Sequence, residues 1–246
     1  MGVIVITGGS RGIGASTAEH VAQRGMGVIL TYNTNPQDAA MVVDRIEQAG
    51  GKAVALKLDV SDVATFEAFG ESVRLTLLKT WGATTLSGLV NNAGYGLFNP
   101  WQPLAKRSSM AFSTCISKAL FPHSDPAAAV GARRQYRQRH QRHYPRIHRW
   151  RRPYAAFKGG LEVLTRYMAK EFGERRIRAN AVSPGAIRTE LGGGLNDEFE
   201  AMLAAQTALG RVGEPSDVAR VIAMLLSEEG AWINAQTLEV SGGYNI

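Results

Sequence analysis

The sequence has little cysteine and no long apolar run. Cys115 is the single cysteine among 246 residues, which excludes an internal disulfide and agrees with a reducing compartment. No segment approaches the roughly 20 consecutive apolar residues that a membrane-spanning helix needs, and Met1 leads into the first apolar run with no charged leader. These absences predict a cytoplasmic protein that has no membrane segment.

Acidic residues are missing from one stretch, residues 131–152. This stretch holds nine arginines and three of the five histidines, and without those arginines 19 basic residues face 21 acidic ones. The formal net charge of +7 therefore belongs to one segment. A basic arm could bind nucleic acid, but the few aromatic residues in it make that the weaker interpretation. Its histidines have no acid or cysteine beside them, so no metal site is predicted.

Apolar runs and helical patterns alternate along the chain. The expected strands are 3–6, 27–32, 53–58, 86–90, 177–182 and 236–240, and the expected helices begin near residues 15, 36, 66, 153 and 215, with a further helix around Phe199. This order predicts an α/β fold: a doubly wound parallel sheet, Rossmann-like, forming a single domain over residues 1–246. Ligands of such sheets bind beyond the carboxyl ends of the strands, where Gly8, Asp59 and Asn91 should gather.

The first strand breaks into glycines before the first helix. Gly8, Gly12 and Gly14 fall where the backbone must turn and come close to a ligand, since a Cβ there would collide with it. The N–H groups at the helix start then form a site for a diphosphate. A glycine-rich turn without a ligand is the alternative.

Tyr154 and Lys158 stand four residues apart at the start of the long helix, which places the phenol and the ammonium on one face. The lysine charge would lower the pKa of the phenol, so that Tyr154 could donate a proton to a carbonyl oxygen. A surface tyrosine beside a solvated lysine is the other interpretation.

Taken in order, these motifs resemble the short-chain dehydrogenase/reductase family, and its oxoacyl-carrier-protein-reductase-like members in particular. The similar parts are residues 2–104 and 153–246, and they include the glycine turn at 7–14, Asn91-Asn92-Ala93-Gly94, the pair Tyr154 and Lys158, and Pro184-Gly185.

The resemblance implies an oxidoreductase that interconverts a carbonyl and a secondary alcohol by hydride transfer. Tyr154 would transfer the proton, and Lys158 would bind the nicotinamide ribose and tune the tyrosine. A homo-oligomer acting on a small molecule is also implied. The residues implied in coenzyme binding are Gly8, Ser10, Arg11, Gly12, Ile13, Gly14, Tyr32, Asn33, Asp59, Val60, Asn91, Ala93, Gly94, Tyr154, Lys158, Pro184, Gly185, Ile187 and Thr189.

The end of the second strand indicates which coenzyme is used. An acid there would hold the ribose 2′-hydroxyl of NAD and repel a phosphate. Residues 32–35 contain no carboxylate, and Arg11 lies in the glycine turn where it could meet a 2′-phosphate. The sequence therefore predicts NADP, with NAD as the weaker alternative.

Residues 186–209 follow a sheet strand and contain three consecutive glycines, 192–194, as a hinge before a helix. Such a segment could be a substrate lid, and a plain surface excursion is the alternative.

Residues 105–152 form an anomalous basic window. The family's structural asparagine falls on Thr114 and its catalytic serine on Gln141, and the arginine-rich run takes the place of a buried fifth strand. A covered strand cannot bury guanidinium groups without partners. A shifted reading frame explains all three departures. Made as written, the chain should have poor activity, and a catalytically impaired dinucleotide-binding protein is the alternative function.

We therefore expect the gene to show a frame shift within codons 104–153. With suitable codons, residues 134–142 read one base later become Gly-Asn-Ile-Val-Asn-Val-Thr-Ser-Val, a strand that ends in a serine in register with Tyr154. Resequencing this part of the gene tests the hypothesis. A frame continuous with homologous codons throughout would contradict it.

Overall fold

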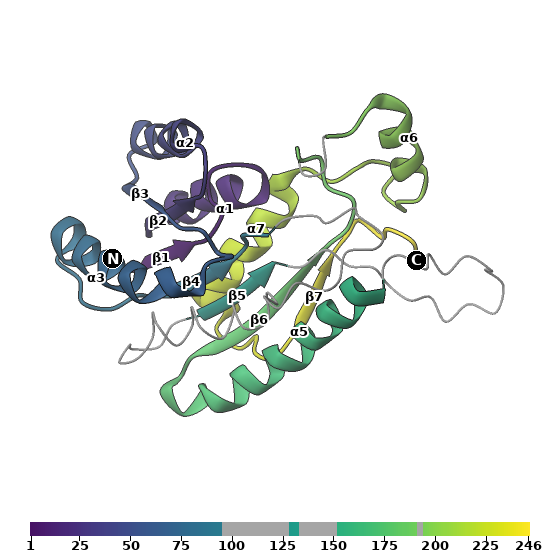
Figure 1. The fold of residues 1–246 in the computed structure, drawn as a ribbon. Coiled ribbons are helices and arrows are strands. Elements are labelled where there is room, and N and C mark those ends of the chain that lie inside the picture. Colours follow the sequence, from purple (N-terminus) through teal and green to yellow (C-terminus); the bar gives the residue numbers. More distant parts are fainter. Residues whose placement is uncertain (95–127, 133–151, 191–193) are drawn as a thin grey trace.

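Seven parallel strands form one twisted sheet in the order β3-β2-β1-β4-β5-β6-β7 (Figure 1). The structure is a computed structural model that describes residues 1–94, 128–132, 152–190 and 194–246, with the backbone alone for 128–132 and 152–158. The strands are β1 (Val3–Ile6), β2 (Gly27–Tyr32), β3 (Ala53–Lys57), β4 (Gly88–Asn91), β5 (Ala128–Ala132), β6 (Arg178–Pro184) and β7 (Thr237–Val240). The predicted doubly wound α/β fold is confirmed.

Helices cover both faces of the sheet (Figure 1). They are α1 (Gly12–Gln23), α2 (Pro36–Gln48), α3 (Phe66–Trp81), α5 (Arg152–Glu171), α6 (Asp197–Ala205) and α7 (Pro215–Leu226), with short 3-10 turns at Val63–Thr65, Gly173–Arg175 and Glu228–Gly230. None of the helices within the described residues is long and apolar enough to cross a bilayer.

The alternation of side chains along β1 explains the two layers. Ile4 and Ile6 pack into a buried cluster with residues of α1, α2 and α7, whereas Val3 and Val5 pack on the other face with residues of α3. All four side chains are at most 1% exposed. A parallel strand covered on both faces needs such a continuous apolar run.

The second half of the sheet is covered by α5. Met168 and Ala169 of this helix form a buried cluster with Ala179 of β6. Next to Ala179, Asn180 is a buried polar residue whose Nδ2 donates to Ile233 O at 2.8 Å, while its Oδ1 accepts from Gln236 N at 3.0 Å. The amide therefore fixes the chain that leads into β7.

The predicted loss of the fifth strand is wrong. The strand is present as β5, and it lies before the arginine-rich run, not within it. It pairs in parallel with β4, where Leu89 lies opposite Ala129, and with β6, where Ala179 lies opposite the same residue. Its five residues are small and uncharged, so the strand requires no buried guanidinium group. The rest of the anomalous window, including Thr114, Cys115 and Gln141, lies outside the described residues.

Candidate active site

The glycine turn lies at the carboxyl end of β1, where the strand order reverses between β1 and β4. Gly8 has φ +63°, and a Cβ on it would lie 2.9 Å from Ala93 Cα. A Cβ on Gly14 would lie 2.1 Å from Gly8 O. Both contacts are shorter than packing allows, so these glycines are required by the close approach of the turn to itself and to the end of β4.

The buried Thr7 hydroxyl ties the turn to the end of β4. Its Oγ1 accepts hydrogen bonds from Asn92 N and Ala93 N, each at 3.0 Å, and donates to Val90 O at 3.3 Å. The Asn92 carboxamide completes the connection, because its Nδ2 donates to Thr7 O and Gly8 O, both at 3.0 Å. A network of hydrogen bonds thus fixes the first and fourth strand ends against each other.

Thr31 of β2 holds the turn from the opposite side. Its hydroxyl accepts from Gly8 N at 3.1 Å, and its carbonyl accepts from Gly9 N at 2.8 Å. Thr7, Thr31 and Asn92 were not among the predicted site residues. They are positioning residues, and their partners lie 22 to 86 residues away in sequence.

The first turn of α1 suits an anion. Arg11 is the extended N-cap residue and is exposed, and the first turn contains no acidic residue. Ser10 and Ile13 are half-buried beside it, and Ile13 packs against the core. Gly12 has φ +54°, as glycine permits. The N–H groups and the arginine charge together favour a phosphate at this helix terminus.

The end of β2 carries no carboxylate, as predicted. Tyr32 packs against the core and Asn33 is exposed. Asn35 caps α2, because its Oδ1 accepts from Gln37 N at 3.1 Å and from Asp38 N at 3.4 Å. The carboxamide of Asn35 is therefore used to cap α2. Arg11 supplies a positive charge in the neighbouring glycine turn.

After β3, Asp59 accepts hydrogen bonds from Ser61 N at 2.8 Å and from Ser61 Oγ at 2.7 Å. Val60 packs against the cluster of α3. At the end of β4, Asn91 closes the strand, and Gly94 is exposed with open space around the position of a Cβ. These predicted residues lie at the same edge of the sheet as the glycine turn.

The opposite wall of the site follows β6. Pro184 is the last residue of this strand, and Gly185 N donates to Val240 O at 3.2 Å. Thr189 lies across from the glycine turn, because its Cγ2 is 3.4 Å from the position that a Cβ would take on Gly12. The fold thus brings together two segments that are almost 180 residues apart in the sequence.

Ile187 lies between Gly185 and Thr189 in the sequence, and its side chain is 3% exposed. It forms a parallel bridge with Gly213, in which Gly213 N donates to Ala186 O and Arg188 N donates to Gly213 O. The N–H and C=O of Ile187 therefore point away from Gly213. A ligand would meet the backbone of Ile187 and not its side chain.

The predicted catalytic pair lies at the start of α5. Tyr154 and Lys158 are both helical and are separated by about one turn, which agrees with the sequence. Their side chains lie outside the described part of the chain, so their contacts stay a prediction. The predicted hinge at 192–194 is described only at Gly194, which has φ +84°.

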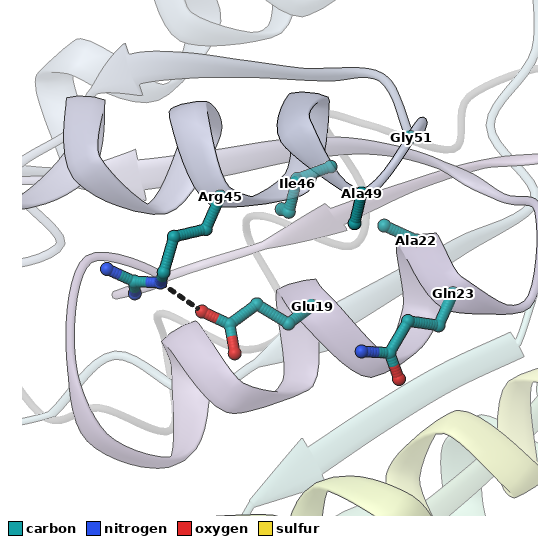
Figure 2. A pocket seen from close by; sticks show the side chains of 7 residues that line it. All are labelled: Glu19, Ala22, Gln23, Arg45, Ile46, Ala49 and Gly51. Atoms are coloured by element: carbon teal, nitrogen blue, oxygen red, sulfur yellow. Dashed lines mark hydrogen bonds and ion pairs between the residues drawn. The ribbon is translucent and has the colours of Figure 1, made fainter.

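The surface between α1 and α2 has a hollow of about 210 Å³ whose lining includes Glu19, Ile46 and Gly51 (Figure 2). Arg45 Nε donates to Glu19 Oε1 across it at 2.7 Å. The hollow is lined from the carboxyl-terminal parts of both helices, away from the glycine turn at the start of α1. We assign no ligand to it. Within the described residues, no three metal-ligating side chains of His, Cys, Asp or Glu gather.

The chain matches known families and structures over nearly its whole length. Residues 2–131 match the family described as short chain dehydrogenase, and residues 142–245 match that described as enoyl-(acyl carrier protein) reductase. An uncharacterized oxidoreductase of Methylorubrum extorquens is 32% identical, with 98% of this chain and 96% of that protein covered.

A 3-oxoacyl-[acyl-carrier-protein] reductase of Staphylococcus aureus is 30% identical, with 97% of this chain and 96% of that protein covered. Among solved structures, a short chain dehydrogenase from Burkholderia cenocepacia in complex with NADP is similar, with a TM-score of 0.84 and 27% identity. The match covers 99% of this chain and 97% of that one.

We expect Thr7→Val to destabilise the protein by about 1–3 kcal/mol, because it leaves Asn92 N and Ala93 N without their acceptor. Thr65→Val is the matched control, since the hydroxyl of Thr65 makes one exposed bond to Asp62 O, and it should change the free energy of unfolding by less than about 0.5 kcal/mol. Urea unfolding measures both. Equal effects of the two substitutions would refute the role given to Thr7.

Proposed function

Because the chain belongs to the short-chain dehydrogenase family and is an oxidoreductase of that type, we propose that it uses NADP to interconvert a carbonyl and a secondary alcohol. The observation that carries the proposal is the glycine turn. Hydrogen bonds of Thr7 and Asn92 fix it at the carboxyl ends of β1 and β4, beside a helix terminus that bears Arg11.

Each part of the site has a role toward a dinucleotide. The backbone of Gly12 to Gly14 would hold the diphosphate at the start of α1, with Ser10 beside it. Arg11 would bind the 2′-phosphate next to Tyr32 and Asn33. Gly8, Asn91, Ala93 and Gly94 would line the ribose and the ring, and Asp59 with Val60 would border the adenine.

On the other wall, Pro184, Gly185, Ile187 and Thr189 would bind the nicotinamide end. The outward N–H and C=O of Ile187 suit a carboxamide, since they supply one donor and one acceptor. The coenzyme, when bound, supplies or accepts the hydride. Binding between two walls that the hydrogen bonds of the fold hold in place would orient its ring toward the substrate.

Tyr154 would move the proton. In the reductive direction its hydroxyl donates to the carbonyl oxygen while the carbonyl carbon gains hydride, so that a secondary alcohol forms. Lys158, one turn later on α5, would hold the nicotinamide ribose and lower the pKa of the phenol by its charge. Oxidation of the alcohol reverses both transfers.

The residue at the serine position decides how active the chain is. Gln141 stands there, and an amide can donate a hydrogen bond to the substrate oxygen but lacks the hydroxyl's ability to donate and accept at one atom. We expect weak activity from the chain as written and full activity from the frame-restored sequence. Gln141 is also the observation that favours the alternative function, a dinucleotide-binding protein with impaired catalysis.

The proposal extends to the substrate, its lid, the assembly and location of the protein, and the basic stretch. The substrate is a small carbonyl or alcohol, covered by residues 186–209 as a lid. The protein acts as a homo-oligomer in the cytoplasm. The basic stretch at 131–152 does not bind nucleic acid, and a gel-shift titration against salt tests this last point.

NADPH should be preferred over NADH by at least about tenfold in kcat/KM, because a charged hydrogen bond to the 2′-phosphate contributes about 1.5–3 kcal/mol. Arg11→Ala should remove most of this preference. Arg24→Ala, at the other end of α1 and paired with Glu229, is the control and should leave it unchanged. A tenfold preference for NADH would overturn the assignment.

Tyr154→Phe should lower kcat by at least about 100-fold, since it removes the proton donor. The Kd for NADPH, followed by its fluorescence, should change far less than kcat, because Lys158 and the backbone of the glycine turn would still hold the coenzyme. Tyr167→Phe alters an exposed phenol of the same helix and should have no effect. Both are measured in the protein translated from the resequenced gene. Retention of full activity in Tyr154→Phe would contradict the proposed role.

A further inference from the structure

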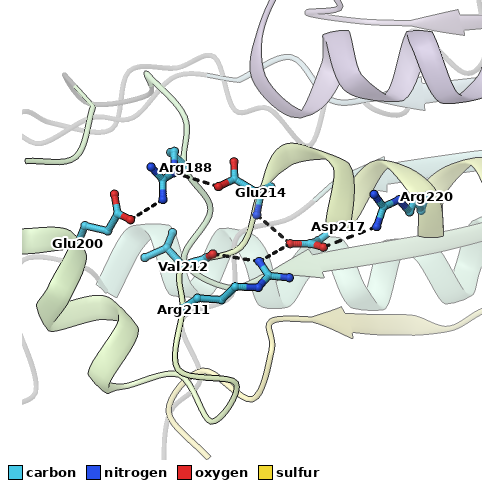
Figure 3. A network of polar contacts seen from close by, with 7 residues as sticks. All are labelled: Arg188, Glu200, Arg211, Val212, Glu214, Asp217 and Arg220. Carbon is cyan, nitrogen blue, oxygen red and sulfur yellow. Dashed lines mark hydrogen bonds and ion pairs between the residues drawn. The ribbon is translucent and has the colours of Figure 1, made fainter. Parts of the chain in front are cut away.

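The guanidinium of Arg188 connects α6 with the start of α7. Both elements follow residues 184–189, which we call the coenzyme wall. Arg188 Nη2 donates to Glu200 Oε1 of α6 at 2.5 Å, and Arg188 Nε lies 3.0 Å from Glu214 Oε1 at the start of α7 (Figure 3). A planar guanidinium presents several donors in a rigid fork, so it can hold two carboxylates from different elements at fixed angles. Arg188 thereby joins α6 to α7.

The backbone of Arg188 belongs to the coenzyme wall. Its N–H donates to Gly213 O at 2.8 Å, and Gly213 N donates to Ala186 O at 2.9 Å. On either side lie Ile187 and Thr189, the residues that would meet the nicotinamide end. The same residue therefore has its backbone in the proposed coenzyme site and its side chain between two helices.

The α7 side of this connection is rigid. Glu214 precedes Pro215, and Glu214 N donates to Asp217 Oδ2 at 2.9 Å. Arg211 Nη1 lies 2.7 Å from the same oxygen, and its hydrogen bond to Asp217 keeps the pKa of that carboxyl below its ordinary value. Val218 and Ile222 then bury α7 in the core. On this side, Arg188 pairs with Glu214, whose backbone is held at the start of a buried helix.

The α6 side is held more weakly. Leu203 is the one buried residue of this nine-residue helix, whereas Phe199 and Met202 are each 46% exposed. Little apolar burial gives a helix a low free energy of local opening. Polar contacts therefore help to hold α6 in place. A hollow of about 340 Å³ is lined by residues of α6, by Arg188 and by residues 210–212.

The far end of α6 has a separate attachment. Gln206 O accepts from Asn245 N at 2.9 Å, and Leu209 N donates to Gly242 O at 3.1 Å. These are backbone bonds to the segment after β7, and they do not involve Arg188. Among the described residues, the ion pair of Arg188 with Glu200 joins α6 to the coenzyme wall.

We propose that Arg188 is a positioning residue that couples the placement of α6 to occupancy of the coenzyme site. The inference rests on the proposed function, because the coupling requires a coenzyme at residues 187–189. Backbone hydrogen bonds already hold residues 186–188, so a coenzyme that contacts Ile187 and Thr189 limits the motion that remains at Arg188. The guanidinium of Arg188 then holds Glu200 and α6 in place as a cover for the substrate.

Hydrogen exchange of the α6 amides is the direct test. In the protein without coenzyme, Arg188→Gln should speed exchange over residues 198–205 by about fivefold, the factor that corresponds to one exposed ion pair at the upper end of its usual range. Arg188→Lys should give a smaller increase, since an ammonium is a point charge that replaces the fork. Salt at 1 M should raise exchange in the unmodified protein and not in Arg188→Gln.

A matched control exists in the ion pair Arg45–Glu19. Its side chains are 52% and 30% exposed, against 54% and 27% for Arg188 and Glu200, and it lies between α1 and α2 (Figure 2). Arg45→Gln should leave the exchange of α6 unchanged. Equal exchange of α6 in Arg188→Gln and in the unmodified protein, or the same acceleration in Arg45→Gln, would overturn the inference.

The effect of NADPH on hydrogen exchange of α6 measures the coupling between coenzyme binding and this helix. Saturating NADPH should slow exchange over residues 198–205 in the unmodified protein and have no such effect in Arg188→Gln. With ethyl acetoacetate as the carbonyl probe, Arg188→Gln should raise KM about fivefold while kcat changes less than twofold. Failure of NADPH to bind would refute the proposed function. Binding of NADPH without any slowing of α6 would refute the coupling alone.

Discussion

The hydroxyl of Thr7 is the contact on which the site depends. It is fully buried, and it meets the backbone of β4 at Val90 O, Asn92 N and Ala93 N. The buried hydroxyl pairs with each of these backbone groups. Its loss would leave the N–H groups of Asn92 and Ala93 without this hydrogen-bond acceptor. The spacing of the first and fourth strand ends, and therefore the shape of the glycine turn, follows from this junction.

These contacts give a rigid glycine turn and a rigid segment after β6, next to a weakly packed helix, α6. Backbone hydrogen bonds fix both walls: Gly9 N to Thr31 O on one side and Arg188 N to Gly213 O on the other, each at 2.8 Å. In contrast, Leu203 is the one buried residue of α6, and Glu200 of this helix pairs with Arg188. Under the proposed function this division would suit an oxidoreductase, because the coenzyme would need a constant geometry while the substrate would have to enter and leave.

Much of this was predictable from local patterns. The apolar runs and glycines of β1 and the turn specify strand, turn and helix within a dozen residues, and the absence of a carboxylate at 32–35 was visible directly. Thr7, Thr31 and Asn92 were missed as site residues because their partners are distant in sequence. Any threonine in a strand would look the same until the fold places it beside β4.

The error over β5 has a different cause. Ala128 to Ala132 contains alanine and glycine, which have low strand propensity, and the prediction weighed the charged residues after it instead. Pairing with both β4 and β6 overrides that local preference. The arginine-rich run explains the net charge, but Ala128–Ala132 takes the fifth-strand position that the distance from Tyr154 had assigned to that run.

The most direct measurement is a crystal structure of the protein with NADPH bound. The account predicts the diphosphate over the first turn of α1, the 2′-phosphate beside Arg11, and the nicotinamide ring between Asn91 and residues 184–189. It also predicts the Tyr154 hydroxyl directed toward the reactive face of that ring. A dinucleotide bound elsewhere, or a glycine turn that leaves no room for the diphosphate, would contradict the account.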